Sequence, residues 1–471
     1  MKRTLVILLG CCLGVNSCYE LDLNPLSQAS SENWYSSETE IEMSVKDFYR
    51  DDFWPLDNED KTDNFIYRET PSEILKGTFN GQSDDVTKLW ANQYKSIARA
   101  NTILANMDKA VNMGISEVKL KQYEGEAFFQ RASCYARLVT YFGDVIYVTE
   151  VVDIDKAFTL GRTAKSEIVP KIYEDYDKAI ENLPEKYSGL SSQRATKGAA
   201  LALKARFALY MGDWSTVVNQ CDSIFNSPKG LGLIDFNTTT MSVYSTASSY
   251  NALIRSNSSS EAIFSGGFCT SGVSQITTNL SYAASSELLA LYDERNDLRY
   301  SSGKNSYFFQ YSKGYYASYR LTNASKLPGN SLVYSEVYLN KAEALALLGR
   351  EAEAISTLQE LRSKRMSDAG TINETGEGLI KFIRDERRRE LCGAGQRWFD
   401  LRRYAVHPTY PEKTTIKHDY YEWDNGTAVL KKTYVLGEYP EDGGWLLPMP
   451  SYALESNEGE LEDNVRPDRE N

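Results

Sequence analysis

Apolar residues recur at helical spacing over most of the chain. Leu89, Tyr94 and Ile97 illustrate the three-to-four-residue period of an amphipathic helix. Stretches with this period cover residues 88–142, 166–183, 195–225, 331–365 and 376–404. Ser166, followed by Glu167, is a suitable N-cap for the second stretch. The pattern predicts a mainly α protein.

A short repeat lies inside three of these stretches. An alanine is followed seven residues later by a glycine at Ala136/Gly143, Ala205/Gly212 and Ala342/Gly349. The alanine allows close helix contact, and the glycine can adopt the left-handed conformation that ends a helix. This arrangement predicts TPR-like helical hairpins within an α-α superhelix. The copies are irregularly spaced, so a tandem array is not expected.

The helical pattern is interrupted by residues 231–329, which are rich in Ser, Thr, Asn and Tyr. Long irregular loops with short strands are the natural interpretation, and such loops usually carry function. Residues 306–322 resemble a β-hairpin that turns at Lys313-Gly314. Residues 420–435 resemble another that turns at Asn425-Gly426.

The N-terminus has the features of a bacterial lipoprotein signal. Lys2 and Arg3 precede an apolar stretch over 5–15 that is too short to span a bilayer as a helix. A small residue then precedes Cys18, as in a lipobox. We therefore expect a signal peptide over 1–18 and lipid attachment at Cys18. The alternative is an ordinary signal peptide cut nearby, with Cys18 incidental.

Charge and motif content exclude several classes of function. The formal charge is −13, and it becomes −15 when Lys2 and Arg3 leave with the signal peptide, so nucleic acid is not an expected partner. His407 and His418 are the only histidines and show no metal-ligand spacing, so no metal or cofactor is predicted. Phosphate-binding and nucleophile-elbow motifs are missing from the sequence.

Four cysteines remain once Cys11, Cys12 and Cys18 are set aside. They are Cys134, Cys221, Cys269 and Cys392. They are far apart and unclustered, which favours buried free thiols over a disulfide framework.

Several motifs together resemble the SusD/RagB family of outer-membrane nutrient-binding lipoproteins. They occur at 90–101 (WANQYKSIARAN), 131–145, 161–200, 387–403 and 447–457. The most specific is Arg387–Leu391 with Gly395–Arg403, and Cys392-Gly393-Ala394 departs from the family pattern. The resemblance implies a mainly α, TPR-like scaffold that captures glycans, or peptides in some members. It also implies a SusC-like TonB-dependent transporter as partner and a surface-exposed position on the outer membrane.

The resemblance divides the mature chain into two regions. Residues 19–235 are expected to form the N-terminal TPR-like helical region. Residues 236–471 are expected to carry the ligand-binding loops and to pack with the first region as one globular body.

A saccharide site needs aromatic platforms for the apolar sugar faces and polar groups for the hydroxyl rim. Two segments, 54–80 and 295–326, supply both. Candidate ligand residues are Trp54, Tyr67, Arg68, Phe79, Asn80, Tyr307, Tyr311, Tyr315 and Tyr316. The structural alternative is that alternating aromatics in a hairpin form one buried face and cross-strand pairs.

The second segment is locally basic, with six Lys or Arg and one acid, Asp297. A positive patch on a negative chain suggests an anionic glycan. Arg299 matches a family position that looks structural, which lowers the available positive charge. A neutral glycan therefore remains the alternative.

No catalytic carboxylate pair is expected, so the chain is not predicted to be an enzyme. Asp385, Glu386 and Glu390 lie on one charged helix, where solvated or salt-bridged roles are expected. Residues 397–403 interleave apolar and charged positions, as buried Arg–carboxylate pairs around an aromatic core would. The prediction is a glycan-capturing lipoprotein. The alternatives are peptide capture, a surface glycosidase, or a scaffold that binds only its transporter.

Overall fold

The structure is a computed structural model. It describes residues 35–49, 61–67, 76, 79–153, 158–187, 193–227, 230–239, 253–254, 259–265, 282–300, 307–312, 315–318, 332–424 and 427–464.

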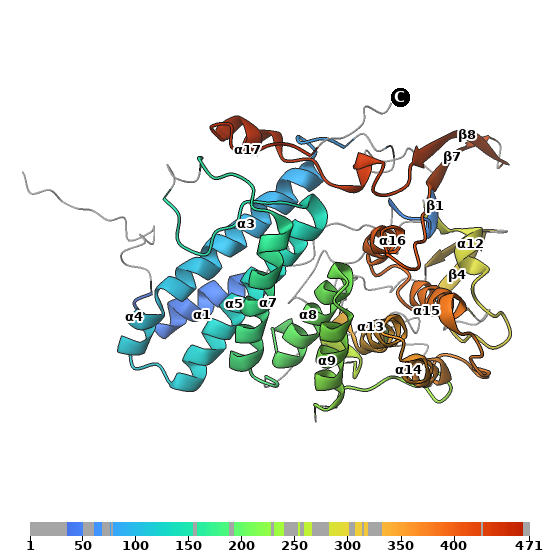
Figure 1. The fold of residues 1–471 in the computed structure, drawn as a ribbon, viewed down its shortest axis with the longest axis horizontal. Helices are drawn as coiled ribbons and strands as arrows, with labels where there is room; N and C mark the ends of the chain where they lie inside the picture. The colour runs from blue at the N-terminus through green and yellow to red at the C-terminus, as the bar shows by residue number, and fades with distance from the viewer. Residues whose placement is uncertain are drawn as a thin grey trace, which may run out of the picture.

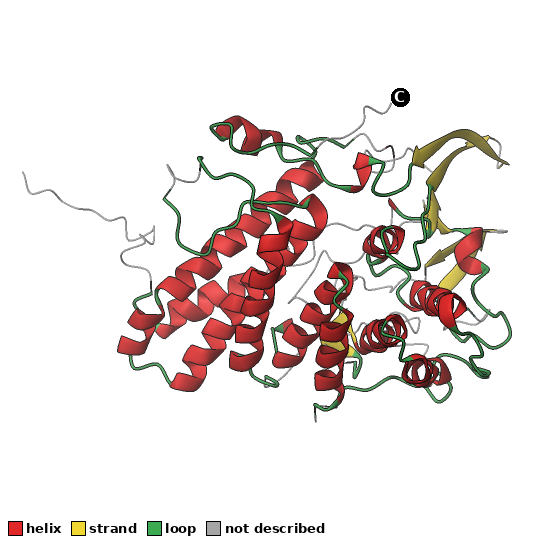
Figure 2. Cartoon of the chain, viewed as in Figure 1, coloured by secondary structure: helices red, strands yellow, loops and turns green. Residues whose placement is uncertain are grey.

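Helices form most of the regular structure, which confirms the mainly α prediction (Figure 2). In the N-terminal half they are α1 (Glu38–Lys46), α3 (Asp84–Ala105), α4 (Met107–Asn112), α5 (Glu117–Phe142), α7 (Lys165–Asn182), α8 (Lys197–Met211) and α9 (Trp214–Phe225). In the C-terminal half they are α12 (Ser286–Leu289), α13 (Tyr334–Leu347), α14 (Glu351–Ser363), α15 (Gly376–Glu390), α16 (Arg397–Ala405) and α17 (Ser451–Ser456).

One predicted helix start is wrong. Helix α7 begins at Lys165, and Ala164 occupies its N-cap, so Ser166 lies inside the first turn. Elsewhere short polar side chains do cap helices: Thr196 Oγ1 accepts the Ala199 N–H at the start of α8. A local serine signal is weak because several nearby residues can satisfy the same position.

The predicted helical hairpins are present. Gly212 and Gly349 have φ of 78° and 76° and end the first helices of α8/α9 and α13/α14. Ala205 and Ala342, 1% and 0% exposed, lie within those first helices. Helix α9 packs against α13, so the two hairpins stack on each other (Figure 1). This is the TPR-like arrangement that the alanine–glycine spacing predicts.

One hydrophobic core runs through both halves of the chain. It includes Phe129 and Phe142 of α5, Phe207 of α8, and Leu339 and Leu345 of α13. A buried ion pair joins the halves at the same place, with Arg206 Nε 2.7 Å from Glu336 Oε1. The two halves therefore share their interior.

Most strands are short. All except β2 and β6, which contact α8, lie at one end of the molecule (Figure 2). The larger sheet has the order β3 (Tyr282–Ala284), β1 (Phe65–Tyr67), β7 (Ile416–Asp424), β8 (Thr427–Leu436). Strands β2 (Ala262–Phe264) and β6 (Leu332–Val333) pair antiparallel, as do β4 (Phe308–Ser312) and β5 (Tyr315–Ser318). The hairpins β4–β5 and β7–β8 are the two that the sequence predicts.

The C-terminal segment returns to the N-terminal helices (Figure 1). Leu447 N–H donates to Tyr141 O at the end of α5, and Glu458 N–H donates to Phe158 O. Arg162 donates to Asn464 Oδ1 over 2.9 Å. Ser451 N–H donates to Gly81 O, which fixes α17 beside the start of α3.

Gly81 is the position most sensitive to an added methyl group. A Cβ there would lie 2.5 Å from Met449 O and 2.8 Å from Ser451 N, both backbone atoms. Gly81→Ala should therefore lower the free energy of unfolding by about 1–3 kcal/mol in urea titrations. Gly232→Ala is the matched control, because a Cβ there meets nothing within 4 Å. Equal stability of the two variants would contradict the packing described here.

Candidate ligand-binding face

The two predicted aromatic segments lie close together, on either side of β3. Strand β1, from the first segment, pairs antiparallel with β3 in the register Phe65↔Ala284 and Tyr67↔Tyr282. Strand β3 in turn lies beside β5 of the second segment. On its other side β1 joins β7 through Tyr67↔Tyr420. We call the surface formed by β1, β3, the hairpin β4–β5 and the hairpin β7–β8 the strand face.

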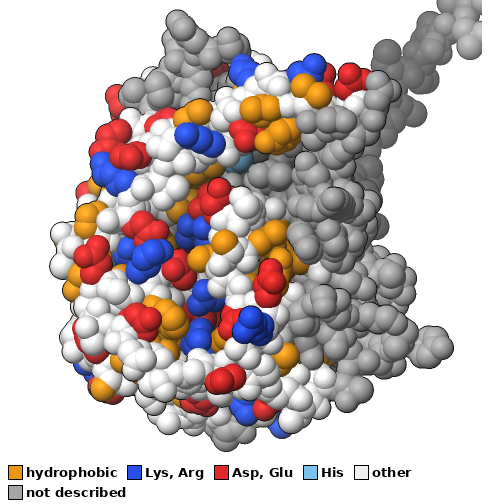
Figure 3. All heavy atoms as spheres, turned by 90° about the vertical axis from the view of Figure 1, so that its right-hand side faces the viewer, with side chains coloured by type: hydrophobic (Ala, Val, Ile, Leu, Met, Phe, Trp, Pro, Cys, Tyr) orange, Lys and Arg blue, Asp and Glu red, His pale blue; other side chains and the backbone are white. Residues whose placement is uncertain are grey.

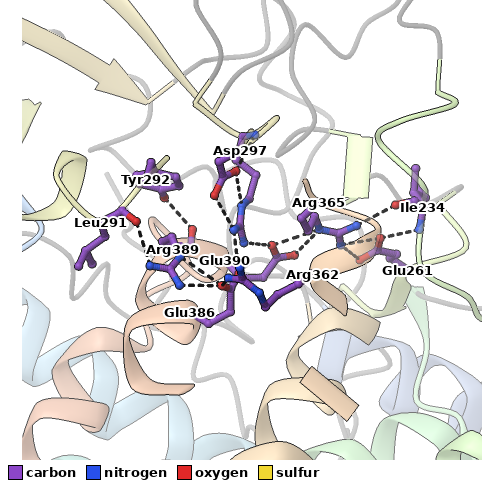
Figure 4. A network of polar contacts seen from close by, with 11 residues as sticks. Ile234, Glu261, Leu291, Tyr292, Asp297, Arg362, Arg365, Glu386, Arg389 and Glu390 are labelled. Atoms are coloured by element: carbon purple, nitrogen blue, oxygen red, sulfur yellow. Dashed lines mark hydrogen bonds and ion pairs between the residues drawn. The ribbon is translucent and has the colours of Figure 1, made fainter. Parts of the chain in front are cut away.

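Four arginines and four carboxylates form a buried network close to the starts of β2 and β4 (Figure 4). They are Arg299, Arg362, Arg365 and Arg389 with Glu261, Asp297, Glu386 and Glu390. Each has less than a tenth of its surface exposed. The equal numbers of opposite charges make this group electrically neutral, which offsets much of the cost of burying it.

Arg299 is the central member of this network. Its guanidinium lies 2.7 Å from Asp297, 2.7 Å from Glu386 and 2.9 Å from Glu390. Its side chain is fully buried. Arg299 is therefore structural, as the sequence analysis suggests, and contributes no positive charge to the protein surface.

The network fastens loops to helices. Arg365, which follows α14, contacts Glu390 of α15 at 3.0 Å and Glu261 before β2 at 2.8 Å. It also donates to Ile234 O over 2.8 Å. The loop segment that carries Asp297 and Arg299 is held to α15 in the same way. Three irregular segments thus take their positions from the ends of two helices.

Burial and ion pairing act in opposite directions on these carboxyls. Burial by itself raises the pKa of Glu386, but Arg299, Arg389 and Arg362 hold that pKa well below its usual range. For Glu261, burial dominates and raises the pKa despite Arg365. Glu386 therefore stays ionised and serves as the common acceptor for three arginines.

The first segment is fastened separately. Asp63 accepts two hydrogen bonds of 2.8 Å from Arg397 and lies 3.2 Å from Arg388. Burial raises the pKa of Asp63, but these two arginines lower it to about 2. His418 of β7 makes a 3.0 Å hydrogen bond between its Nε2 and Thr62 O. The Ser285 hydroxyl donates to Asp63 O, which ties this loop to the start of α12.

The carboxylates considered as a possible catalytic pair are salt-bridged. Glu386 and Glu390 belong to the buried network, and Asp385 pairs with Lys381 on the surface at 3.0 Å. The prediction for 397–403 is also confirmed, since Arg403 lies 2.6 Å from Glu343 and 2.9 Å from Asp400.

Two predicted ligand residues lie in the interior. Phe79 is 5% exposed and belongs to the main core, with Lys61 Nζ 5.7 Å from its ring centre. Tyr307 is 1% exposed and belongs to a second core that also contains Phe236 and Tyr292. Neither ring has a face open to solvent. For Tyr307 the cause is that aromatics flanking a hairpin also build its buried side. Phe79 lies in the loop before α3 and packs into the main core.

Asn80 is exposed at the turn before α3. Its Oδ1 accepts the Gln82 N–H over 2.8 Å, and its own N–H donates to Ser83 Oγ. This is the usual role of Asn in a turn.

Of the other candidates, the structure describes mainly the backbone. Tyr311 lies on β4 and Tyr315 and Tyr316 on β5, where Tyr316 pairs with Gln310 and Tyr315 with Ser312. Tyr67 lies on β1 opposite Tyr282. Trp54, Arg68 and Cys18 fall outside the described residues, as do Cys269 and most of the basic residues in 295–326.

Sequence reasoning missed three tyrosines on the strand face. Tyr420 and Tyr421 of β7 and Tyr434 of β8 are each partly exposed. Lys432 Nζ lies 4.8 Å from the centre of the Tyr434 ring. The sequence does predict the hairpin over 420–435. The alternation of side chains along its strands could have assigned each aromatic residue to one face of the hairpin.

Over the described part of this end of the molecule, acidic, basic and apolar side chains are interspersed (Figure 3).

Within the described ranges, no group of three or more metal-ligating side chains is found. No helix in the same ranges is long and apolar enough to cross a membrane. Cys134, Cys221 and Cys392 are buried free thiols, as expected.

By architecture, then, this is a TPR-like helical protein that carries a loop-rich strand face at one end. Two family models match it: residues 24–209 match one described as "Starch-binding associating with outer membrane", and residues 278–466 match the SusD family. The chain belongs to the SusD/RagB family.

Individual relatives agree with this assignment. A SusD-like protein, P2, of Formosa agariphila is 24% identical over 86% of this chain and 90% of its own length. A second, P25, from the same organism is 32% identical over a stretch of 151 residues, which spans 28% of that protein.

Solved structures share the fold. A SusD superfamily protein from Bacteroides thetaiotaomicron superposes with a TM-score of 0.72 at 18% identity, over 91% of this chain and 99% of that one. A laminarin-binding SusD-like protein gives 0.62 at 19% identity, over 91% and 99% of the two chains.

Removing Arg299 should strongly destabilise the protein. Arg299→Met leaves Asp297, Glu386 and Glu390 with one fewer buried partner, so the free energy of unfolding should fall by about 3–5 kcal/mol. Arg350→Met removes an exposed ion pair with Glu353 and should leave stability nearly unchanged. Denaturant titration of both variants tests this, and a small loss for Arg299→Met would show that the network is not a principal support.

The Asp63 ion pairs should make stability depend on acidity. Because the pKa of Asp63 falls from 3.8 to about 2 on folding, its ionised form contributes about 2 kcal/mol above pH 4. That contribution is lost as the pH falls through the range from 4 to 2. The stability difference between wild type and Asp63→Asn, measured by urea unfolding at several pH values, should narrow over this range. A difference that does not vary with pH would disprove the assignment.

Proposed function

We propose that this protein is a lipid-anchored, surface-exposed glycan-binding protein of the outer membrane. It captures oligosaccharides on the strand face and delivers them to a SusC-like TonB-dependent transporter. Its membrane attachment is the lipid on Cys18, which follows the signal peptide. The protein binds its ligand without catalysing a reaction.

One observation carries the proposal: β3 pairs with β1 and also lies beside β5, which brings two aromatic-rich segments, far apart in sequence, close to each other. Flat rings with polar edges match the apolar faces and hydroxyl rims of sugars. The buried network positions that surface in advance, so little ordering is required when a ligand binds. The family model described as starch-binding and the laminarin-binding neighbour support the same class of ligand.

The proposed contacts are the candidates predicted from the sequence, apart from the two that are buried. Tyr311, Tyr315 and Tyr316 on the β4–β5 hairpin would supply ring faces. Tyr67 and Trp54 would add further rings, while Arg68 and Asn80 would bond the sugar hydroxyls. Phe79 and Tyr307 are left out of this set because both are buried.

The state of the carboxylates at this end of the chain also favours ligand binding over catalysis. The buried carboxylates of the network, including Glu261, Glu386 and Glu390, are engaged by arginines. A glycosidase needs two carboxyl groups facing a substrate across an open space. Buried, arginine-paired carboxylates cannot fill those roles.

Glycan binding can be tested with a panel of laminarin, alginate and a tryptic peptide mixture, using isothermal titration calorimetry over a salt series. We expect a polysaccharide to bind and the peptides not to bind. Tyr315→Ala with Tyr316→Ala should weaken binding about tenfold, which corresponds to about 1.4 kcal/mol. A salt-sensitive preference for alginate would indicate an anionic ligand.

Phe158→Ala is the matched control, because this exposed aromatic residue lies beside α17, away from the strand face. Its binding should equal that of wild type. Binding of peptides alone, or release of shorter sugars from a bound polysaccharide, would refute glycan capture.

A further inference from the structure

The β7–β8 hairpin forms an arm at the edge of the strand face. It projects beyond the helices at the end of the molecule where β1 lies (Figure 1). Its base is secured, because Ile416 and Leu436 enter a small core with Trp398 and Trp445. A two-stranded ribbon that extends past its core gains little stability from its outer residues. Outer residues such as Leu430, Lys431 and Lys432 are exposed.

One face of the arm runs from the interior into solvent. Side chains alternate along a strand, so Ile416, His418 and Tyr420 share a face of β7. The residues opposite them on β8 are Leu436, Tyr434 and Lys432. Ile416 and His418 are buried, whereas Tyr420 and Tyr434 are partly exposed and Lys432 is exposed. Along the arm, side chains change from buried to exposed at Tyr420 and Tyr434.

Tyr420 and Tyr434 are diagonal neighbours on this face. Tyr420 lies opposite Lys432, and Tyr434 lies opposite His418, one pair further along. Such neighbours are separated by about 7–8 Å, within reach of aromatic rings. Two rings at this spacing can contact one extended chain at successive positions.

Polar groups surround the two rings. The Tyr420 hydroxyl donates to Glu422 Oε1 over 3.2 Å, and Lys431 lies 3.2 Å from Glu422 Oε2. Lys432 Nζ lies over the Tyr434 ring at 4.8 Å. Carboxylate, ammonium and phenol groups beside aromatic faces are what a sugar with several hydroxyls requires.

The arm is also electrically neutral. It carries Lys417, Lys431 and Lys432 against Asp419, Glu422 and Asp424, in a chain of net charge −13. An acidic polysaccharide can therefore approach the arm with less repulsion than it meets over the rest of the molecule.

We propose that Tyr420 and Tyr434 form a second saccharide-binding subsite, which continues from the contacts proposed on β1 through the Tyr67↔Tyr420 pairing and holds a distant part of the same polysaccharide chain. This inference rests on the glycan-binding function proposed above. Occupation of two connected subsites by one chain makes the arm important for long ligands and unimportant for short ones.

The test compares long and short forms of two glycans: laminarin with its trisaccharide, and alginate with its trisaccharide. Binding is measured by isothermal titration calorimetry for Tyr420→Ala, Tyr434→Ala and the double variant in the full mature chain. For whichever polysaccharide binds, each single change should weaken affinity about three- to tenfold. Affinity for the trisaccharide should remain unchanged. Tyr420→Phe and Tyr434→Phe retain the rings and should restore most of the binding.

Leu430→Thr is the matched control, since Leu430 is 51% exposed and projects from the opposite face of the arm. It should bind both forms as wild type does. Equal loss in this variant would show that the arm supports the fold instead of contacting sugar, and would overturn the proposal. Unchanged binding in the double tyrosine variant would also overturn it and leave the arm as a protein contact. If wild type binds neither polysaccharide, the function proposed above fails first, and the subsite fails with it.

Discussion

The neutral cluster of four arginines and four carboxylates is the interaction on which the functional end of this protein depends. Charged groups without water are tolerated only when each has a nearby opposite charge, so the cluster accepts very few arrangements. That restriction fixes the positions of the loop segments that carry these residues, although the loops have little regular structure of their own. Arg299 and Arg365 link loops to α14 and α15, whose ends are held in turn by the hydrophobic core.

Sequence alone predicted the scaffold well because its signals are local. Helical periodicity located the helical stretches, and left-handed glycines at 212 and 349 ended helices where the repeat indicated. Two-residue turns at 313–314 and 425–426 marked both hairpins, whose strands pair on either side. Each signal lies within a few residues of the feature it predicts. Ser166 failed because a capping side chain competes with its neighbours for one position.

The candidate site was harder to predict because accessibility is a property of the whole fold. Phe79 and Tyr307 lie in aromatic-rich segments of the sequence, yet both are buried by segments distant in sequence. The partly exposed Tyr420 and Tyr434 were overlooked, although their hairpin was recognised. An aromatic residue in a short strand has two possible faces, and only the register of the whole sheet decides between them. The pairing of β1 with β3, separated by more than 200 residues, has no local signal at all.

The return of the C-terminal segment to the first helices has a consequence for biosynthesis. Arg162 reaches Asn464 across 302 positions, and Leu447 bonds to the end of α5. A chain that folds from its N-terminus has none of these contacts until residues 447–464 are also present. The early helices therefore stay incompletely covered until that segment packs against them. A truncation that removes this segment would expose surface at the end of α5, far away in sequence.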